Sequence, residues 1–335
     1  MPYITRAGKG GVPRFRHHKQ EVYHKIAAFG KAALRTAFLL GIGFVMLYPV
    51  LFILSGAFKA KQDVYDPTVI WFPKHYSLEA MGLALDTLKF GKSVGRTLAI
   101  LVPSVLLQMV STLMAGYGFA RFRFRERGIL FALLIFTIIV PVQNLIVPLY
   151  ANFQSFDMLG AGYLFGAVTG EGLPNLLDTN LPFYLMAAFG MGIRSGLYIF
   201  IMRQFFRNMP AELEEAALID GCGSVKTFTR VMLPNVVPAL VTVLVFSIVW
   251  YWNDYYQASM FLMSDQTLSV NLTMLNGMLS ITAQNVAGLT SQDLMLMRDA
   301  VLECGCLVTL LPLLVMYLFL QRFFTESIER TGIVG

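Results

Sequence analysis

Apolar runs of about 20 residues recur along the whole of this sequence, and they constrain its fold more than any other feature. The chain has 335 residues, of which 56% are hydrophobic and only 14% are charged. Soluble domains carry about 25% charged residues. A run of about 20 apolar residues is long enough to cross the hydrocarbon core of a bilayer as a helix. The sequence therefore predicts an all-α integral membrane protein.

Six such runs can be delimited between a basic segment, residues 1–31, and a short polar tail, residues 324–335. The predicted spans are about 32–58, 93–119, 129–150, 183–206, 234–261 and 300–323. Pro141 and Pro148 predict kinks in the outer half of the third span. The residues from Arg14 onward could form an amphipathic helix on the inner membrane surface. The segment before the first run is too long for a cleaved signal peptide, so the first span is expected to remain as an anchor.

Lysine and arginine gather in three clusters, and their placement predicts the topology. The clusters lie at 6–35, 121–127 and 203–230, and the intervals between them are poorer in cations. Loops rich in Lys and Arg remain on the cytoplasmic side of a membrane. Six spans place all three clusters and both termini on that side. The same pattern argues against a nucleic-acid footprint.

The interval between the fourth and fifth spans, 207–233, is too well organised for a simple return loop. Pro210 and the glutamates that follow it suit the first turn of a helix. Gly221 can end that helix in the left-handed conformation. Ser224 can cap a second helix, and Pro234 is expected to open the fifth span. From the residues alone, the interval is either a docking surface or an amphipathic helix lying on the inner leaflet.

A resemblance favours the docking surface. Glu215-Ala216-Ala217, Gly221, Val231 and Leu233-Pro234 stand at the spacing of the cytoplasmic signature loop of permease subunits in binding-protein-dependent ABC importers. Asp220 also fits, and Val231 stands where isoleucine is usual. Further fragments resemble the carbohydrate branch, specifically the second, six-span permease of maltose-type importers: MAGYGFARFRFR, VPLY, IFIMRQFF, VWYWNDY and QRFF. The outer loop at 151–181 is longer than in that pattern, and the tail ends in TGIVG.

The resemblance implies a type I ABC importer permease fold in the bacterial plasma membrane. It also implies four kinds of partner: a second permease subunit, two ATPase subunits, an extracytoplasmic solute-binding protein and membrane lipid. The loop would form a coupling helix seated on an ATPase subunit, with Glu215, Ala216, Ala217, Asp220 and Gly221 as the contact residues. ATP and Mg²⁺ would be bound by the partner ATPases, and this chain would carry no cofactor. A permease for amino acids, peptides or phosphate would share the loop.

Four residues are candidates for the translocation path. Trp252, Asn253 and Asp254 lie in the aromatic stretch WYWNDYY near the predicted outer interface, where rings and polar groups suit a sugar. An ordinary aromatic belt at the membrane surface is the alternative. Arg194 falls in the middle to outer part of the fourth span, where an unpaired charge is costly in lipid. It either lines the path, which would favour an acidic sugar, or it reaches the outer surface or a carboxylate.

Other classes of protein fit the sequence less well. Gly91-Lys92-Ser93 is not a phosphate-binding loop, because Asp86 stands where the first glycine is required. The glycines between 190 and 196 lack the spacing and context of a dinucleotide site. An ion-driven transporter would need ionisable residues within several spans, and a membrane-embedded enzyme would need paired ones. Apart from Arg194, the spans offer almost none.

Overall fold

The structure is a computed structural model that describes residues 15–157, 160–170, 172–285 and 290–332. Over these residues the chain is helical, and the one β-type pairing is an isolated antiparallel bridge between Lys59 and Tyr76. The prediction of an all-α chain is therefore confirmed. In chain order the elements are α1 (Phe15–Gly56), α2 (Glu79–Thr87), α3 (Phe90–Arg121), α4 (Arg127–Ile139), α5 (Gln143–Gln154), α6 (Ala161–Thr169), α7 (Leu181–Ala188), α8 (Ser195–Asn208), α9 (Glu212–Ile219), α10 (Ser224–Thr227), the π-helical turn η1 (Phe228–Met232), α11 (Leu233–Trp252), α12 (Tyr256–Phe261), α13 (Leu268–Asn285) and α14 (Ser291–Gly332).

Four helices of the described chain are long and apolar enough to cross a membrane. They cover Ala28–Gly56, Phe90–Arg121, Ser224–Trp252 and Gln292–Phe319. The pair α4 and α5 makes a fifth span if the two bent helices are counted together. These five correspond to the predicted first, second, third, fifth and sixth spans. The predicted fourth span does not form one uninterrupted helix.

The third predicted span, 129–150, is broken and not merely kinked. The axes of α4 and α5 differ by 106° across a break of three residues. Pro141 lies in that break, where its ring and missing N–H oppose continuation of the helix. Pro148, the second proline expected to bend this span, lies inside α5.

The fourth predicted span, 183–206, is divided into α7 and α8 by the segment 189–194. Gly190 adopts a left-handed φ of 70° and ends α7. Its N–H donates to the carbonyl of Ala187 at 3.3 Å, and the N–H of Met191 donates to that of Met186 at 2.7 Å. This pair of hydrogen bonds is the Schellman motif, which closes a helix at a glycine.

Two further boundaries differ from the prediction. The fifth predicted span, 234–261, ends at Trp252, and its last residues form the separate helix α12. Pro234 does not begin a helix, because α10, η1 and α11 form one continuous helix from Ser224 to Trp252. A proline ring clashes with the carbonyl four residues earlier in a regular α-helix. The wider π-helical turn directly before Pro234 accommodates that ring.

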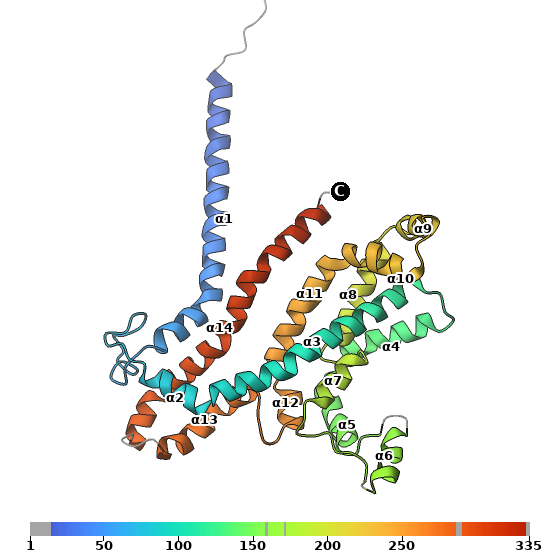
Figure 1. The fold of residues 1–335 in the computed structure, drawn as a ribbon. Helices are drawn as coiled ribbons and strands as arrows, with labels where there is room; N and C mark the ends of the chain where they lie inside the picture. Colours follow the sequence, from blue (N-terminus) through green and yellow to red (C-terminus); the bar gives the residue numbers. More distant parts are fainter. Residues whose placement is uncertain (1–14, 158–159, 171, 286–289, 333–335) are drawn as a thin grey trace, which may run out of the picture.

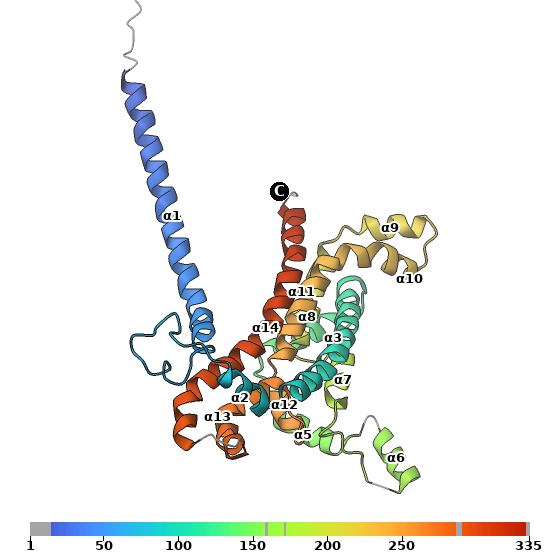
Figure 2. The same cartoon turned by 60° about the vertical axis from the view of Figure 1, so that its left-hand side comes forward.

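The amino-terminal helix also runs further than predicted. The helix expected from Arg14 onward is present from Phe15, but it is continuous with the first span and not a separate surface helix. Figure 1 shows α1 standing away from the other helices along most of its length, and Figure 2 shows the same from a second direction. Its last turns approach α14, where the thiol of Cys304 donates to the carbonyl of Ala57 at 3.0 Å.

The central helix is α3, which packs against α7, α8, α11 and α13. Small residues permit the closest approach. A methyl group added at Gly116 would overlap the Cβ of Met202 and stand 3.0 Å from the backbone nitrogen of Arg203, both on α8. In both views the start of α1, the end of α14 and the α9–α10 turn lie toward one end of the molecule (Figures 1 and 2). The helices α2, α6 and α13 lie toward the opposite end.

Candidate functional site: the α9–α10 turn

The predicted docking interval forms a tight helix–turn–helix. Gly221 has a φ of 79°, and the chain closes α9 with a second Schellman motif. The N–H of Gly221 donates to Leu218 at 3.1 Å and the N–H of Cys222 donates to Ala217 at 2.9 Å. The predicted stop at Asp220-Gly221 is therefore correct. Ser224, predicted as a cap, is the first residue of α10 and makes no side-chain capping bond.

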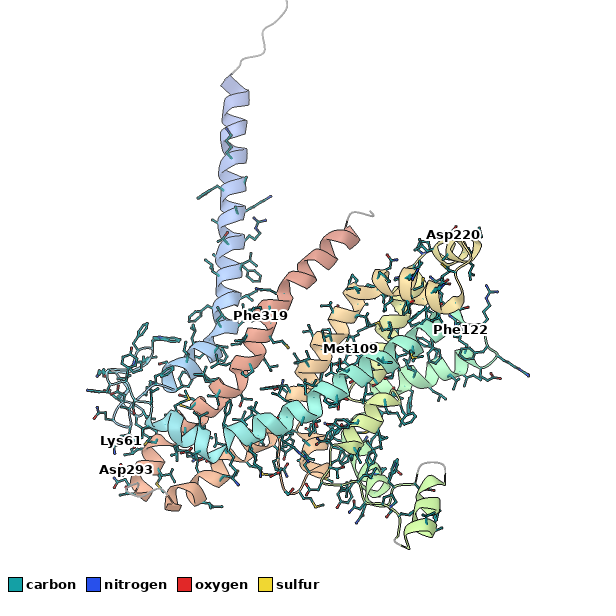
Figure 3. All side chains as sticks on the ribbon, in the orientation of Figure 1. Lys61, Met109, Phe122, Asp220, Asp293 and Phe319 are labelled. Carbon is teal, nitrogen blue, oxygen red and sulfur yellow. The ribbon has the colours of Figure 1, made fainter. Side chains whose placement is uncertain are left out.

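This turn carries an exposed apolar surface at its tip. Ile219 is 86% exposed, Val225 76% and Leu218 54%. Figure 3 shows Asp220 at the outermost part of the turn, away from the packed helices. We call this surface the docking turn and define it as residues 215–225. Exposed aliphatic side chains grouped in this way are typical of interaction surfaces.

The five predicted contact residues do not all point outward. Glu215, Ala216, Asp220 and Gly221 are exposed. Ala217 is buried, with 6% of its surface accessible, and lies on the inner face of α9. Its small side chain therefore sets how closely α9 approaches the rest of the chain. The apolar contacts Leu218, Ile219 and Val225 were not predicted, although they lie inside the predicted interval.

The helix α9, which leads into the docking turn, is held against the end of α3 by polar contacts. The carboxylate of Glu214 accepts a hydrogen bond from the hydroxyl of Tyr117 at 3.3 Å and lies 3.3 Å from the Nε of Arg121. Arg121 also donates to the carbonyl of Met209 at 2.9 Å. Glu214 therefore faces inward, whereas its neighbour Glu215 is exposed. Sequence reasoning missed this pair on α3, although a spacing of four residues places Tyr117 and Arg121 on one helix face.

An aromatic cluster joins the turn to the helix that follows it. The ring of Tyr117 packs edge-on against Phe206 of α8 at 5.2 Å and against Phe228 of η1 at 4.8 Å. Met232, also in η1, is fully buried. The docking turn, the end of α3 and the start of the long α10–α11 helix therefore form one packed unit.

Of the residues predicted for the translocation path, Trp252 and Asp254 make contacts that organise the fold. Trp252 is 5% exposed, and its indole N–H donates to the carbonyl of Thr309 at 3.1 Å, which joins α11 to α14. The carboxylate of Asp254 accepts from the backbone N–H groups of Gln257 at 3.3 Å and Ala258 at 2.9 Å. Asp254 therefore starts α12. These two side chains are not on the open surface.

Arg194 and Asn253 are exposed, and Arg194 lies at the break between α7 and α8. Its φ is 59°, and its guanidinium stacks on the ring of Trp250 with 4.3 Å from Cζ to the ring centroid. The break is fixed from α3, where Gln108 donates to the carbonyl of Ile193 at 2.7 Å and to the hydroxyl of Ser195 at 2.9 Å. Arg194 is thus held at a fixed point of an interrupted helix.

Comparison with known proteins identifies the family to which this chain belongs. Residues 109–330 match the model of the binding-protein-dependent transport system inner membrane component. The chain belongs to this family. Its matched region begins on α3 and contains the docking turn. The family is a membrane component of binding-protein-dependent transport systems. This finding argues against the two alternative classes, an ion-driven transporter and a membrane-embedded enzyme.

Several relatives of this transport component are named as sugar import permeases. The chain is 28% identical over 288 residues to the melibiose/raffinose/stachyose import permease MelC of Bacillus subtilis, covering 86% of this chain and 91% of that one. It is 27% identical over 299 residues to the diacetylchitobiose uptake permease NgcG of Streptomyces coelicolor, covering 89% and 88%. A further relative, whose name states no solute, is LplC of Bacillus subtilis, which is 27% identical over 300 residues, covering 89% of this chain and 92% of that one.

A solved structure supports the fold of this inner membrane component. A chain of a bacterial ABC transporter that imports the acidic polysaccharide alginate superposes with a TM-score of 0.63. The match covers 89% of this chain and 98% of that chain at 21% sequence identity. The type I importer permease fold is therefore shared. Among the described residues, no group of three or more His, Cys, Asp or Glu side chains could hold a metal ion.

Proposed function

We propose that this protein is the membrane-spanning permease subunit of an ATP-driven importer and forms half of a translocation pore for a sugar or oligosaccharide. The observation that carries the proposal is the docking turn, in which the signature residues Glu215 and Gly221 frame an exposed apolar tip. The family supports the transport role. The names of MelC and NgcG support the solute class.

In this proposal the docking turn is displaced by a movement of another chain, the ATPase subunit that binds it. ATP and Mg²⁺ are bound by two ATPase subunits, and a groove on one of them holds α9. When the ATPases close, the groove moves and carries the turn with it. The pinned, capped turn passes that displacement into α11, whereas a mobile loop would absorb it. A second permease subunit completes the pore, and an extracytoplasmic solute-binding protein delivers the solute.

The proposed topology retains six spans within residues 32–323 and places both termini in the cytoplasm. The fourth and third spans then cross as broken helices. Interrupted helices are tolerated in membranes where the exposed backbone is covered by protein or faces a water-filled path. The basic clusters at 121–127 and 203–230 lie at the same end of the molecule as the docking turn, which supports a cytoplasmic position for that end.

The interrupted fourth span also supports a place for the solute path. Arg194 is 14 residues from the end of α8, or about 21 Å at 1.5 Å per residue, so it lies well inside the bilayer. A charge at that depth is expected to face protein or water and not lipid. We assign Arg194 and Asn253 to the path, with Trp252 and Asp254 holding the surrounding helices. A guanidinium at this point would favour an acidic or hydroxyl-rich solute.

The docking proposal predicts a loss of ATPase binding when the tip of the turn is made polar. Ile219→Ser is expected to abolish co-purification of the ATPase subunits and ATP-dependent solute uptake, because it removes the most exposed apolar contact. The folded chain should be unaffected, since Ile219 is 86% exposed. Co-purification from detergent-solubilised membranes and uptake into vesicles measure the two effects.

The matched control is Val168→Ser, which changes an aliphatic side chain that is 87% exposed on α6, at the opposite end of the molecule. It should retain both ATPase binding and uptake. If Ile219→Ser binds the ATPases as well as Val168→Ser does, the docking turn is not the coupling surface.

A further inference from the structure

Three helices bring uncharged polar side chains together at the break between α7 and α8. The helices α3, α8 and α11 all pack against one another. Each of them contributes two polar side chains, which stand three or four residues apart and therefore lie on one face of their helix. We call this set the polar layer, and it consists of Ser104 and Gln108 of α3, Ser195 and Tyr198 of α8, and Ser247 and Tyr251 of α11.

The polar layer is enclosed by this chain alone. Four of its side chains are 0% exposed: Ser104, Gln108, Tyr198 and Ser247. Side chains that are buried within one chain stay buried when further subunits assemble around it. Any partner of these groups must therefore belong to this chain or be small enough to lie inside it.

Four buried oxygens of the polar layer have no hydrogen-bond partner among the described residues. They are the hydroxyls of Ser104, Tyr198 and Ser247 and the Oε1 of Gln108. Turning the amide of Gln108 does not help, because its Nε2 donates to the carbonyl of Ile193 at 2.7 Å, and a carbonyl oxygen only accepts. Buried polar groups are rarely left without a partner, since each such group is costly. Four in one layer therefore indicate a ligand between them.

The side chains of the polar layer face one another across the helices. Ser247 interacts with the hydroxyl of Tyr198, although neither oxygen has the geometry of a direct hydrogen bond. Ser104 interacts in turn with Tyr251. The Tyr251 hydroxyl lies at the break itself, because a methyl group added at Gly192 would stand 2.6 Å from it. Polar groups that interact without a direct hydrogen bond are typical partners of a bridging water.

The chemistry of the polar layer suits water and not an ion. None of its side chains is charged, whereas buried hard cations are usually bound by carboxylates. Hydroxyls both donate and accept hydrogen bonds, as water requires. A buried water has roughly two to four polar partners, and the unpartnered oxygens of the layer supply that number. Half of the layer is serine, whose small side chain leaves more room between helices than an aliphatic one does.

We propose that the polar layer binds internal water between Ser104, Gln108, Tyr198 and Ser247, and that this water stabilises the break between α7 and α8. In this arrangement the water donates to the Oε1 of Gln108 and accepts from the hydroxyl of Tyr198. Interrupted helices in membranes depend on such substitutes, and ordered water is one of them. The inference goes beyond the transport role, because it rests on contacts within one chain.

Radiolytic footprinting tests this proposal in the assembled transporter in lipid nanodiscs. X-ray irradiation converts water to hydroxyl radicals, these oxidise the side chain beside the water, and mass spectrometry locates the added oxygen. We expect Tyr198 to be oxidised although it is 0% exposed. The control is Phe206, which is equally buried in the same helix but packs against the rings of Tyr117 and Phe228. It should remain unmodified.

A double variant, Ser104→Ala with Ser247→Ala, tests whether the oxidising water is bound by the layer. Loss of two hydroxyls should lower the occupancy of the water, and with it the oxidation of Tyr198, by about tenfold. The matched control is Thr112→Val, which removes a buried hydroxyl of α3 that already donates to the carbonyl of Gln108 at 2.6 Å. It should leave the oxidation of Tyr198 unchanged.

Phe206 also reports on the fold, since its protection in a variant shows that the core is intact. If the double variant exposes Phe206, the single variant Ser247→Ala is measured in its place, with a smaller decrease expected. An unmodified Tyr198 in the natural chain would overturn the proposal. Equal oxidation of Tyr198 in the natural chain and in a folded serine variant would also overturn it. So would equal oxidation of Tyr198 and Phe206 in the natural chain, because bulk water would then reach the whole core.

Discussion

At the scale of single residues, Asp178 joins two segments that are far apart in the sequence. Its carboxylate accepts hydrogen bonds from the backbone N–H of Met263 at 2.9 Å and of Ser264 at 3.0 Å. Its own N–H donates to the carbonyl of Phe261 at 2.7 Å. The bonds to Ser264 and then Met263 lower the pKa of Asp178 below its ordinary value. Asp178 therefore ties the loop before α7 to the loop after α12.

This contact predicts an acid-sensitive loop. A carboxylate whose pKa is lowered by folding stabilises the protein above its unfolded pKa of 3.8, and the stabilisation is lost as the pH falls through the lower folded value. Protection factors of the Met263 and Ser264 amides, measured by hydrogen exchange, should fall over that acidic range. Asp178→Asn should make them independent of pH, because the amide oxygen still accepts but does not titrate.

The variant Asp178→Gly removes the carboxylate without introducing backbone strain, so it isolates the contribution of the side chain. The φ of Asp178 is 60°, a conformation that glycine adopts without cost. This variant should lose the protection of both amides at every pH. Protection that survives in Asp178→Gly would show that the side chain does not hold the two loops together.

Residue-scale prediction from the sequence was accurate where a backbone requirement is local. Gly221 was predicted to end α9, and its left-handed φ confirms this. Glu214 and Glu215 are adjacent acidic residues of the same helix turn, and nothing in their order shows which one faces Arg121. That distinction depends on how α9 packs on α3, which is a property of the folded chain.

At the scale of elements, the approach of α3 and α8 depends on Gly116. Gly116→Ala is expected to destabilise the protein by about 1–3 kcal/mol, because the added methyl group would meet Met202 and the α8 backbone in a packed core. The measurement is the midpoint of thermal unfolding in lipid nanodiscs. Gly118→Ala is the control in the same helix, since the nearest atom to its added methyl group is 3.9 Å away on Phe122. Equal midpoints for the two variants would contradict the tight packing.

The sequence predicted the uninterrupted helices well and the broken ones less well. The predicted second span, 93–119, lies within α3 because a long apolar run with few helix-breaking residues has one regular solution. The break between α7 and α8 was missed. It is stabilised by Gln108, which stands 85 residues before Ile193. A hydropathy pattern contains no information on such a distant hydrogen bond.

At the scale of the whole molecule, the proposed topology predicts which surfaces are accessible from each side. Ile219→Cys and Met263→Cys are made in a chain whose three natural cysteines, Cys222, Cys304 and Cys306, are replaced by serine. In right-side-out vesicles, a membrane-impermeant maleimide should label Met263→Cys at once. It should label Ile219→Cys only after permeabilisation, because the docking turn faces the cytoplasm. Labelling of both without permeabilisation, or in the reverse order, would rule out six spans with both termini inside.

The π-helical turn η1 sets the angle, about the helix axis, between the two parts of the continuous Ser224–Trp252 helix that it joins, α10 and α11. A π-helical turn holds one residue more than the α-helical turn it replaces. Since each residue of an α-helix turns the chain by about 100°, deletion of one residue from 228–232 would restore regular geometry and swing the docking turn by about that angle around the axis of α11. The face that α11 packs against its neighbouring helices and the direction in which the α9–α10 turn points are therefore set relative to each other by a single inserted residue.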